Sequence, residues 1–228
     1  MRYKTVVFDF DSTLISVDSL EIILNSLVNK DPEKLNIIAR LTNEAMNGEI
    51  SFKDALIGRF NIAMPTQQSI TNFITAHCPD SLSTGMAKLI RILQENNVDI
   101  FIISGGFKEV ILPFANYLNL PQQNIYAVEI DWDNEGNFIG LNNSNGFADS
   151  KIKGAEKIRS KFSGNSVIIG DGFTDYQLYQ ASIVGDFIAY TGNTKRQKVI
   201  KYAPHIAESV NDLLQLFALP PLSEWVRQ

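Results

Sequence analysis

Our expectation for the fold of this chain rests on the stretch Val6-Val7-Phe8-Asp9-Phe10-Asp11-Ser12-Thr13-Leu14. A short apolar run followed by acidic residues is typical of a buried parallel strand that carries carboxylates at its carboxyl end. Ligands of open α/β sheets bind at that edge. We therefore expect the first strand to lead directly into a binding site.

The spacing of Asp9 and Asp11 has a chemical consequence. Residues two apart in a strand lie on the same face. Two neighbouring carboxylates repel each other unless a proton or a cation lies between them, and Mg2+ prefers oxygen ligands. The pair therefore favours a magnesium site, although a strand that simply ends in solvated acids fits the same two residues.

Composition and charge exclude several classes of protein. The 228 residues, 45% hydrophobic, are enough for one core domain with a smaller insertion. A formal net charge of -5 and a pI near 5.1 argue against a nucleic-acid partner, which would require a basic surface. The single cysteine, Cys78, cannot form an internal disulfide. Without a membrane-spanning run or a secretory signal, we expect a cytoplasmic protein with no membrane partner.

The segment after the first strand has a helical pattern. Apolar residues recur at helical spacing in the ranges 20–27, 35–45, 52–60 and 70–74, and no strand pattern interrupts them. We therefore predict that residues 14–79 form a small helical cap inserted after the first strand. Residues 1–13 and 80–228 would form the catalytic core.

Strand and helix patterns alternate through the rest of the chain. We expect strands at 98–103, 167–169 and 187–190, helices at 86–93, 108–119, 151–162 and 210–217, and a hairpin from 125–130 and 138–141. This alternation is typical of α/β proteins. The predicted core is a Rossmann-like, mostly parallel sheet with helices on both faces.

Polar residues follow two further strands of this sheet. Ser104-Gly105-Gly106 opens a helix and offers a hydroxyl and backbone N–H groups to an anion, although it also fits a tight turn. Asp171, between two glycines, repeats the acidic strand end, and Asp175 lies one helical turn further on. A phosphate site built from carboxylates also needs a fixed cation, and either Lys151 or Lys153 can supply it.

Four segments carry a resemblance to a known family. They are, in order, Asp-Phe-Asp-Ser-Thr-Leu (9–14), Ser-Gly-Gly-Phe (104–107), Lys153-Gly154 and Gly-Asp-Gly-Phe-Thr-Asp (170–175). This set resembles the motifs of the haloacid dehalogenase superfamily of phosphatases, with phosphoserine phosphatases most alike. Ala45-Met46-Asn47-Gly48 with Phe52 and Arg59 is similar to their substrate-recognition segment, and Tyr190-Thr191-Gly192-Asn193 with Arg196 also fits.

The resemblance implies catalytic roles for the core residues. Asp9 would be the nucleophile that forms an aspartyl-phosphate, and Asp11 the general acid and then the general base. The resemblance implies that the ligands of Mg2+ are Asp9, Asp171 and the backbone carbonyl of Asp11, with Asp175 in or just outside the metal shell.

The family also implies the phosphate ligands, which are Ser104, Gly105 and a lysine. Because the family's lysine precedes a glycine, the resemblance favours Lys153 over Lys151. Catalysis would thus need Asp9, Asp11, Ser104 and Lys153.

The implied substrate contacts lie mostly in the cap. They are Asp18, Met46, Phe52, Arg59 and, in the core, Thr174. The family usually has glutamate where this chain has Asp18, which is one methylene shorter. Asp18 also fits an ordinary helix N-cap, and Glu21 is an alternative contact for an amine.

The expected function is hydrolysis of L-phosphoserine, a small phosphomonoester, with Mg2+ as cofactor. One alternative keeps the chemistry and changes the substrate to another small phosphorylated metabolite, as the aspartate at position 18 suggests. A second is a catalytically silent protein that binds a phosphorylated ligand and regulates. The intact set of Asp9, Asp11, Lys153 and Asp171 argues against the second alternative.

Overall fold

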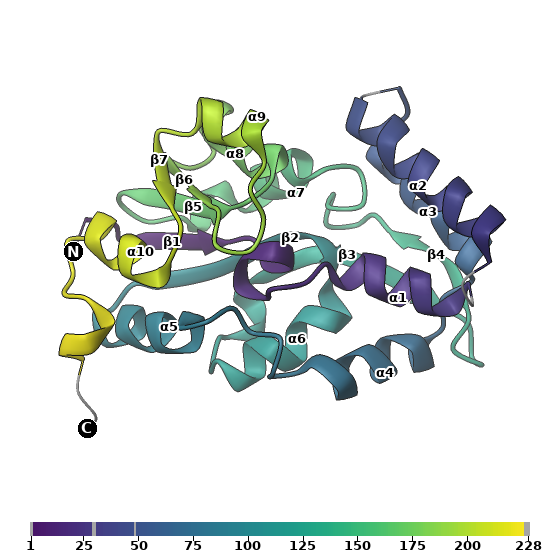
Figure 1. The fold of residues 1–228 in the computed structure, drawn as a ribbon, viewed down its shortest axis with the longest axis horizontal. Coiled ribbons are helices and arrows are strands. Elements are labelled where there is room, and N and C mark those ends of the chain that lie inside the picture. Colours follow the sequence, from purple (N-terminus) through teal and green to yellow (C-terminus); the bar gives the residue numbers. More distant parts are fainter. Residues whose placement is uncertain (1, 29–30, 48, 226–228) are drawn as a thin grey trace.

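The structure is a computed structural model that describes residues 2–28, 31–47 and 49–225. Its centre is a seven-stranded sheet with the strand order β4-β3-β2-β1-β5-β6-β7 (Figure 1). The strands are β1 (Thr5–Phe8), β2 (Asp99–Phe107), β3 (Ile125–Trp132), β4 (Phe138–Asn142), β5 (Ser166–Gly170), β6 (Asp186–Tyr190) and β7 (His205–Ala207). Neighbouring strands are parallel except in the β3–β4 hairpin. The predicted α/β class with a mostly parallel sheet is confirmed.

Strand β1 lies in the middle of the sheet because its side chains are apolar on both faces. Val6, Val7 and Phe8 are fully buried, and β1 pairs with β2 on one side and β5 on the other. Helices cover the two faces of the sheet (Figure 1). On one side lie α5 (Met86–Glu95) and α6 (Lys108–Tyr117), and on the other lie α7 (Lys151–Ile158) and α8 (Phe173–Gln180).

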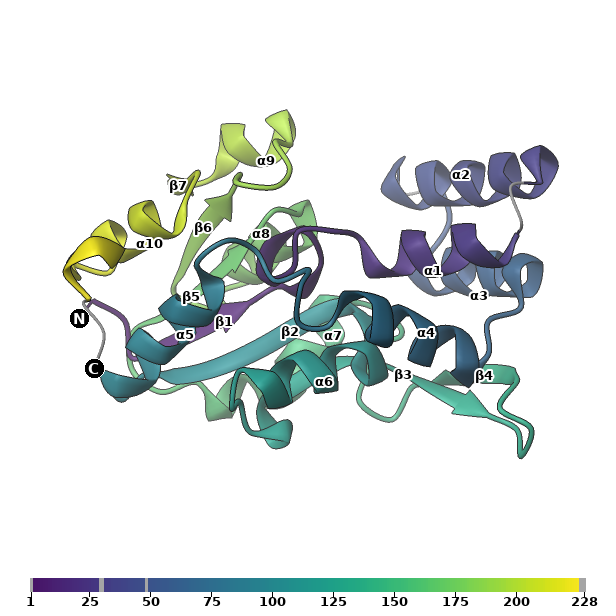
Figure 2. The same ribbon diagram turned by 60° about the horizontal axis from the view of Figure 1, so that its bottom comes forward.

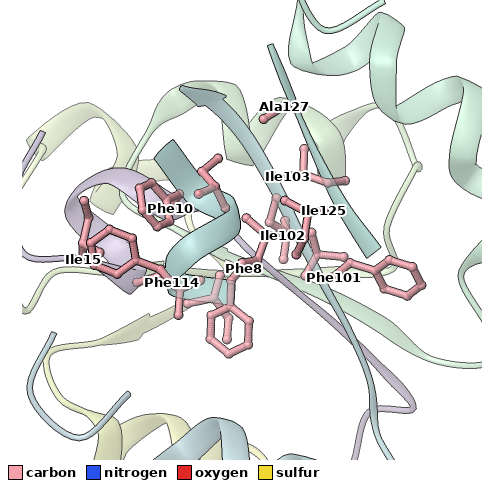
Figure 3. Close-up of a cluster of buried hydrophobic side chains, with 14 of the residues drawn as sticks. Phe8, Phe10, Ile15, Phe101, Ile102, Ile103, Phe114, Ile125 and Ala127 are labelled. Carbon is pink, nitrogen blue, oxygen red and sulfur yellow. The ribbon is translucent and has the colours of Figure 1, made fainter. Parts of the chain in front are cut away.

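The core extends from the sheet into the turn that follows β1. Figure 3 shows Phe8 and Phe10 among buried side chains of β2, β3 and α6. Phe10 packs edge to face on Phe114 of α6, with ring centroids 5.3 Å apart. The residue between Asp9 and Asp11 is therefore anchored in the core, which holds the two acids at the sheet edge.

In the described part of the chain, four α-helices lie between β1 and α5. They are α1 (Ser19–Leu27), α2 (Pro32–Asn47), α3 (Phe52–Ala63) and α4 (Gln67–His77). Helix α1 contacts α3 and α4, and α2 packs on α3. Figure 2 shows α1, α2 and α3 at one end of the molecule, whereas α4 runs along α6. The helical segment predicted as a cap thus contains four helices, the last of which packs against the core.

Several details differ from the predicted elements. Strand β2 runs on to Phe107 rather than ending at residue 103, because Phe107 pairs with Val128 of β3 beyond a shift in register. Helix α9 (Gln197–Tyr202) and strand β7 were not predicted, whereas α10 (Val210–Leu216) matches the helix expected at 210–217 and precedes a short 3-10 helix at Leu222–Glu224. Within the described ranges, no helix combines the length and apolarity needed to cross a membrane.

Candidate active site

Three adjacent strands bring the candidate residues to one edge of the sheet. Because β2, β1 and β5 are parallel neighbours, their carboxyl ends meet there. Asp9 follows β1 directly, Asp171 follows β5 directly, and Ser104 lies near the end of β2. All three residues are buried. This is the edge at which the sequence predicted a binding site.

A buried lysine joins two of the acids. Lys151 Nζ donates hydrogen bonds to Asp9 Oδ1 at 2.7 Å and to Asp175 Oδ1 at 2.6 Å. Burial by itself lowers the pKa of Lys151, but the negative charges of Asp175 and Asp9 outweigh that effect and raise it. The ammonium therefore stays charged and fixed beside Asp9.

The structure corrects the choice between the two lysines. The side chain of Lys153 is 65% exposed, and its ammonium lies 3.4 Å from Asp149 Oδ2, on the surface. Lys151 shares the buried face of α7 with Ala155 and Ile158, at the helical spacing i, i+4 and i+7. That spacing is the signal in the sequence that identifies Lys151 as the inward-facing lysine.

Packing explains the glycine at position 154, which had favoured Lys153 as the phosphate-binding lysine. A Cβ atom on Gly154 would overlap the ring of Phe147. Gly154 therefore lets α7 approach Phe147 closely and does not mark its neighbour as the phosphate-binding lysine. The prediction that Lys153 binds phosphate rested on this glycine, and the position of Lys153 on the surface contradicts it.

Asp9, Asp171 and Asp175 form a buried group of oxygen donors. One carboxylate oxygen of each lies within 4.8 Å of the others. Burial raises the pKa of Asp171, and the charge of Asp9 adds to the effect. The same two causes raise the pKa of Asp175 to about 7. Such crowded carboxylates are stabilised by a hard cation, so this donor set fits Mg2+.

The three acids of this group have different partners. Asp175 uses both oxygens, because Oδ1 accepts from Lys151 and Oδ2 accepts from the backbone N–H of Gly172 at 3.0 Å. Asp171 Oδ2 accepts from Arg196 Nε at 2.8 Å. Asp175 thus holds Lys151 in place, and its predicted position in or just outside a metal shell stays a prediction.

Asp11 lies in the turn after β1, and its carboxylate points toward α1. Asp11 Oδ1 accepts from the backbone N–H of Ser19 at 2.8 Å. Burial raises the pKa of Asp11 to about 8, and the charge of Asp18 adds to the effect. A carboxyl group with this pKa is protonated at neutral pH, as a general acid must be. The metal contact predicted for Asp11 involves its backbone carbonyl and stays a prediction.

The glycines after Ser104 let other groups approach β2. Ser104 Oγ accepts from the backbone N–H of Gly106 at 2.9 Å. A Cβ atom on Gly106 would lie 2.8 Å from Asp11 Oδ2. One on Gly105 would lie 3.6 Å from the ring of Phe52 and 3.9 Å from Lys151 Cε. Phe52, from the predicted cap, therefore lies against the predicted phosphate-binding loop.

Arg59 and Asp18 lie on the helical segment above this edge. Arg59 donates to Ala55 O at 3.3 Å and to Thr42 Oγ1 at 3.4 Å, and in the described part of the chain it forms no ion pair. Burial lowers the pKa of Arg59, whereas the charge of Asp18 opposes that shift. Asp18 Oδ1 accepts from the backbone N–H of Glu21 at 2.9 Å, so Asp18 is the N-cap of α1.

The two remaining predicted substrate contacts are less defined. Thr174 lies in the first turn of α8 with an exposed side chain. Met46 belongs to α2, but its side chain lies outside the described residues.

The contact of Arg196 with Asp171 was not predicted, because the loop before α9 has no pattern that indicates where its side chains point.

Comparison with known proteins identifies the family of this chain. The sequence model of the haloacid dehalogenase-like hydrolase family matches residues 6–180. The phosphoserine phosphatase of Drosophila melanogaster is 33% identical over 215 residues, which cover 92% of this chain and 77% of that protein. The phosphoserine phosphatase of Homo sapiens is 32% identical over 197 residues, which cover 85% of this chain and 84% of that protein.

A solved structure is also similar. A phosphoserine phosphohydrolase-like protein from Francisella tularensis subsp. tularensis SCHU S4 matches with a TM-score of 0.87 and 46% identity, covering 93% of this chain and 99% of that one. The chain therefore belongs to the haloacid dehalogenase-like hydrolase family, and it is a phosphoric monoester hydrolase of the phosphoserine phosphatase-like kind.

Proposed function

We propose that this enzyme hydrolyses L-phosphoserine to serine and phosphate through an aspartyl-phosphate on Asp9, with Mg2+ as cofactor. The observation that carries the proposal is the buried hydrogen bond from Lys151 Nζ to Asp9 Oδ1 at 2.7 Å. The raised pKa of Asp11 supports its role as the general acid. Lys151 holds one oxygen of Asp9, which orients the carboxylate for attack. The names of the relatives support the substrate.

The chemistry proceeds in two displacements. A carboxylate oxygen of Asp9 attacks phosphorus, the bond from phosphorus to the serine oxygen breaks, and Asp11 gives its proton to that oxygen. Asp11, now ionised, takes a proton from a water molecule that attacks the phosphoryl group. The bond from phosphorus to Asp9 then breaks, which releases phosphate and restores both acids.

The oxygens of the transferring group are held by the residues around Asp9. Ser104, the backbone N–H of Gly105 and Lys151 are the proposed donors, with Thr174 at the rim. Fixed donors and charges aimed at the phosphoryl oxygens stabilise the transition state. Asp9, Asp171 and the backbone carbonyl of Asp11 would hold Mg2+, which supplies positive charge against the phosphoryl oxygens when bound.

The helical segment 14–79 would act as the cap that selects the substrate. Arg59, a half-buried guanidinium with no carboxylate partner in the described residues, would bind the substrate carboxylate through parallel hydrogen bonds. Asp18 would attract the amine, and Phe52 and Met46 would wall the pocket. A cap over the site would exclude water from the first displacement.

The test is phosphate release from phosphoserine, phosphothreonine and phosphoethanolamine with Mg2+. We expect phosphoserine to have the highest kcat/KM. Arg59→Gln should lower kcat/KM about 100-fold for phosphoserine but leave it nearly unchanged for phosphoethanolamine, which has no carboxylate. Equal losses on both substrates would contradict the role of Arg59, and no Mg2+-dependent release from any of them would contradict the enzyme mechanism.

A second candidate keeps the chemistry and changes the substrate. It is favoured by Asp18, which is shorter than the family's glutamate and already uses one oxygen to cap α1. If the wild type is poor with phosphoserine and Asp18→Glu improves it, the natural substrate is another small phosphomonoester.

A further inference from the structure

The side-chain amide of Asn193 joins segments that are far apart in the chain. Asn193 lies in the loop between β6 and α9. Its Nδ2 donates to Ser83 Oγ at 2.7 Å and to the backbone carbonyl of Ser12 at 3.1 Å, with the carbonyl of Ile15 at 3.5 Å. One amide thus contacts both the turn after β1 and the segment that returns from the predicted cap.

Ser83 extends this contact to a second carbonyl of the turn. Ser83 Oγ donates to the carbonyl of Thr13 at 2.7 Å, and its backbone N–H donates to the carbonyl of Leu14 at 2.9 Å. Ser83 is 2% exposed. In such a buried place these carbonyls have few other donors, and leaving them unpaired is unfavourable. Asn193 and Ser83 therefore determine where the peptide groups after Asp11 lie.

The turn after β1 needs external support. Ser12 has a φ of +55°, in the left-handed region that non-glycine residues rarely adopt. Ser12 directly follows Asp11, whose carboxylate is bound on its other side by the backbone N–H of Ser19. The packing of Phe10 in the core and the backbone hydrogen bond from Ser12 to Val17 also hold this turn. Besides these, the position of the Asp11 carboxylate depends on contacts at Ser19 and at the carbonyl of Ser12.

We propose that Asn193 is a positioning residue for Asp11, acting through the carbonyl of Ser12 and through Ser83. This rests on the proposed role of Asp11 as general acid. Asn193 need not touch the substrate. Its amide holds the turn so that the Asp11 carboxyl group meets the leaving oxygen, and a small displacement of that group slows proton transfer.

The test compares leaving groups, because an alkoxide needs a proton from Asp11 and a nitrophenolate does not. Asn193→Ala should lower kcat/KM for an alkyl phosphomonoester at least about tenfold more than kcat/KM for p-nitrophenyl phosphate. Ser83→Ala removes the hydrogen bond from Ser83 Oγ to the carbonyl of Thr13. It should shift the ratio of the two kcat/KM values in the same direction. Asp11→Asn is the positive control for this pattern.

A matched control is Asn124→Ala. Asn124 Nδ2 donates to the carbonyl of Ile100 at 2.9 Å, the same kind of bond away from Asp11. This variant should leave the ratio of the two kcat/KM values unchanged. A loss of stability alone would lower both kcat/KM values by the same factor. If Asn193→Ala also lowers both activities by one common factor, the positioning role is wrong.

Amide hydrogen exchange separates this inference from the proposed function. Asn193→Ala should speed exchange in the peptide covering residues 10–20, which includes the Ser19 amide bound to Asp11, whereas Asn124→Ala should not. Faster exchange with an unchanged substrate ratio would overturn the role of Asn193 in catalysis. A wild type that hydrolyses neither ester, with an Asp11→Asn variant equally inactive, would instead overturn the proposed function on which this role rests.

Discussion

Lys151 Nζ lies 2.6 Å from Asp175 Oδ1, in an ion pair whose carboxylate side chain is wholly buried and whose lysine side chain is 8% exposed. The second oxygen of Asp175 is bound by the backbone of Gly172. Asp175 therefore fixes the position of Lys151, whose ammonium also pairs with Asp9. These contacts join α8, α7 and the end of β1.

Lys151→Met is expected to lower kcat about 100-fold to 1000-fold, because it removes a charged donor to the transferring group. Lys153→Met is the matched control on the same helix, and it should leave kcat within about twofold since its ammonium is on the surface. Steady-state kinetics of the two variants checks the choice of lysine. The reverse order of losses would contradict it.

Asp175→Asn should destabilise the fold by about 1 to 3 kcal/mol, because an amide has only one acceptor oxygen and leaves either Lys151 or the N–H of Gly172 without its buried partner. Denaturant unfolding of the metal-free protein measures this change. Asp149→Asn offers a control, since Asp149 pairs with Lys153 and Lys53 near the surface at 3.4 and 3.6 Å. It should cost less than about 1 kcal/mol. Equal costs would mean that burial of the Lys151 pair is unimportant.

Gly106→Ala should lower kcat about 100-fold while the protein stays folded. The added Cβ would lie 2.8 Å from Asp11 Oδ2, so the Asp11 side chain must move, and a shift of about 1 Å is enough for such a loss. Gly140→Ala is the control, because a Cβ there meets nothing within 4 Å. Activity and melting temperature measured together check the prediction, which fails if Gly106→Ala keeps full activity.

Stability of the metal-free protein should fall as the pH rises from about 5 to about 8. Asp11 has an ordinary pKa of 3.8, raised in the fold to about 8, and that of Asp175 is raised to about 7. Between these values the folded protein holds protons that the unfolded chain has lost, so a higher pH favours unfolding. Thermal melts across this range measure the slope.

Mg2+ should reverse this dependence, because it binds the ionised carboxylates and competes with their protons. The rise in melting temperature on adding Mg2+ should be larger at pH 8 than at pH 6. Asp171→Asn should remove most of that rise, since it takes one carboxylate from the buried group. A rise that is independent of pH would show that the acids are already ionised in the metal-free protein.

Much of the site was predictable because the chain order of a parallel sheet carries spatial information. Asp9, Ser104 and Asp171 each follow an apolar run, and the carboxyl ends of parallel strands share one edge. Their meeting therefore followed from the alternation of strands and helices. The inward direction of Lys151 could also have been predicted, since helical spacing puts it on the buried face of α7 with Ala155.

Other contacts could not be predicted because they join residues whose separation in the chain has no regular pattern. Arg196 meets Asp171 across 25 positions, and Asn193 meets Ser12 across 181. Each leaves from a loop, where no helical or strand period indicates the direction of a side chain. Gly154 misled the choice of lysine because its neighbour Phe147, which requires the glycine, lies outside the helix.

The central strands of the sheet, the helices that cover it and the edge at which the acids gather follow from local properties of the chain, namely hydrophobic periodicity and strand ends. The contacts of Lys151 with Asp9 and Asp175, and of Asn193 with Ser12, form only once the chain is folded. Those contacts depend on how separate segments pack, and the free energy that selects them comes from burial and paired charges across the whole fold.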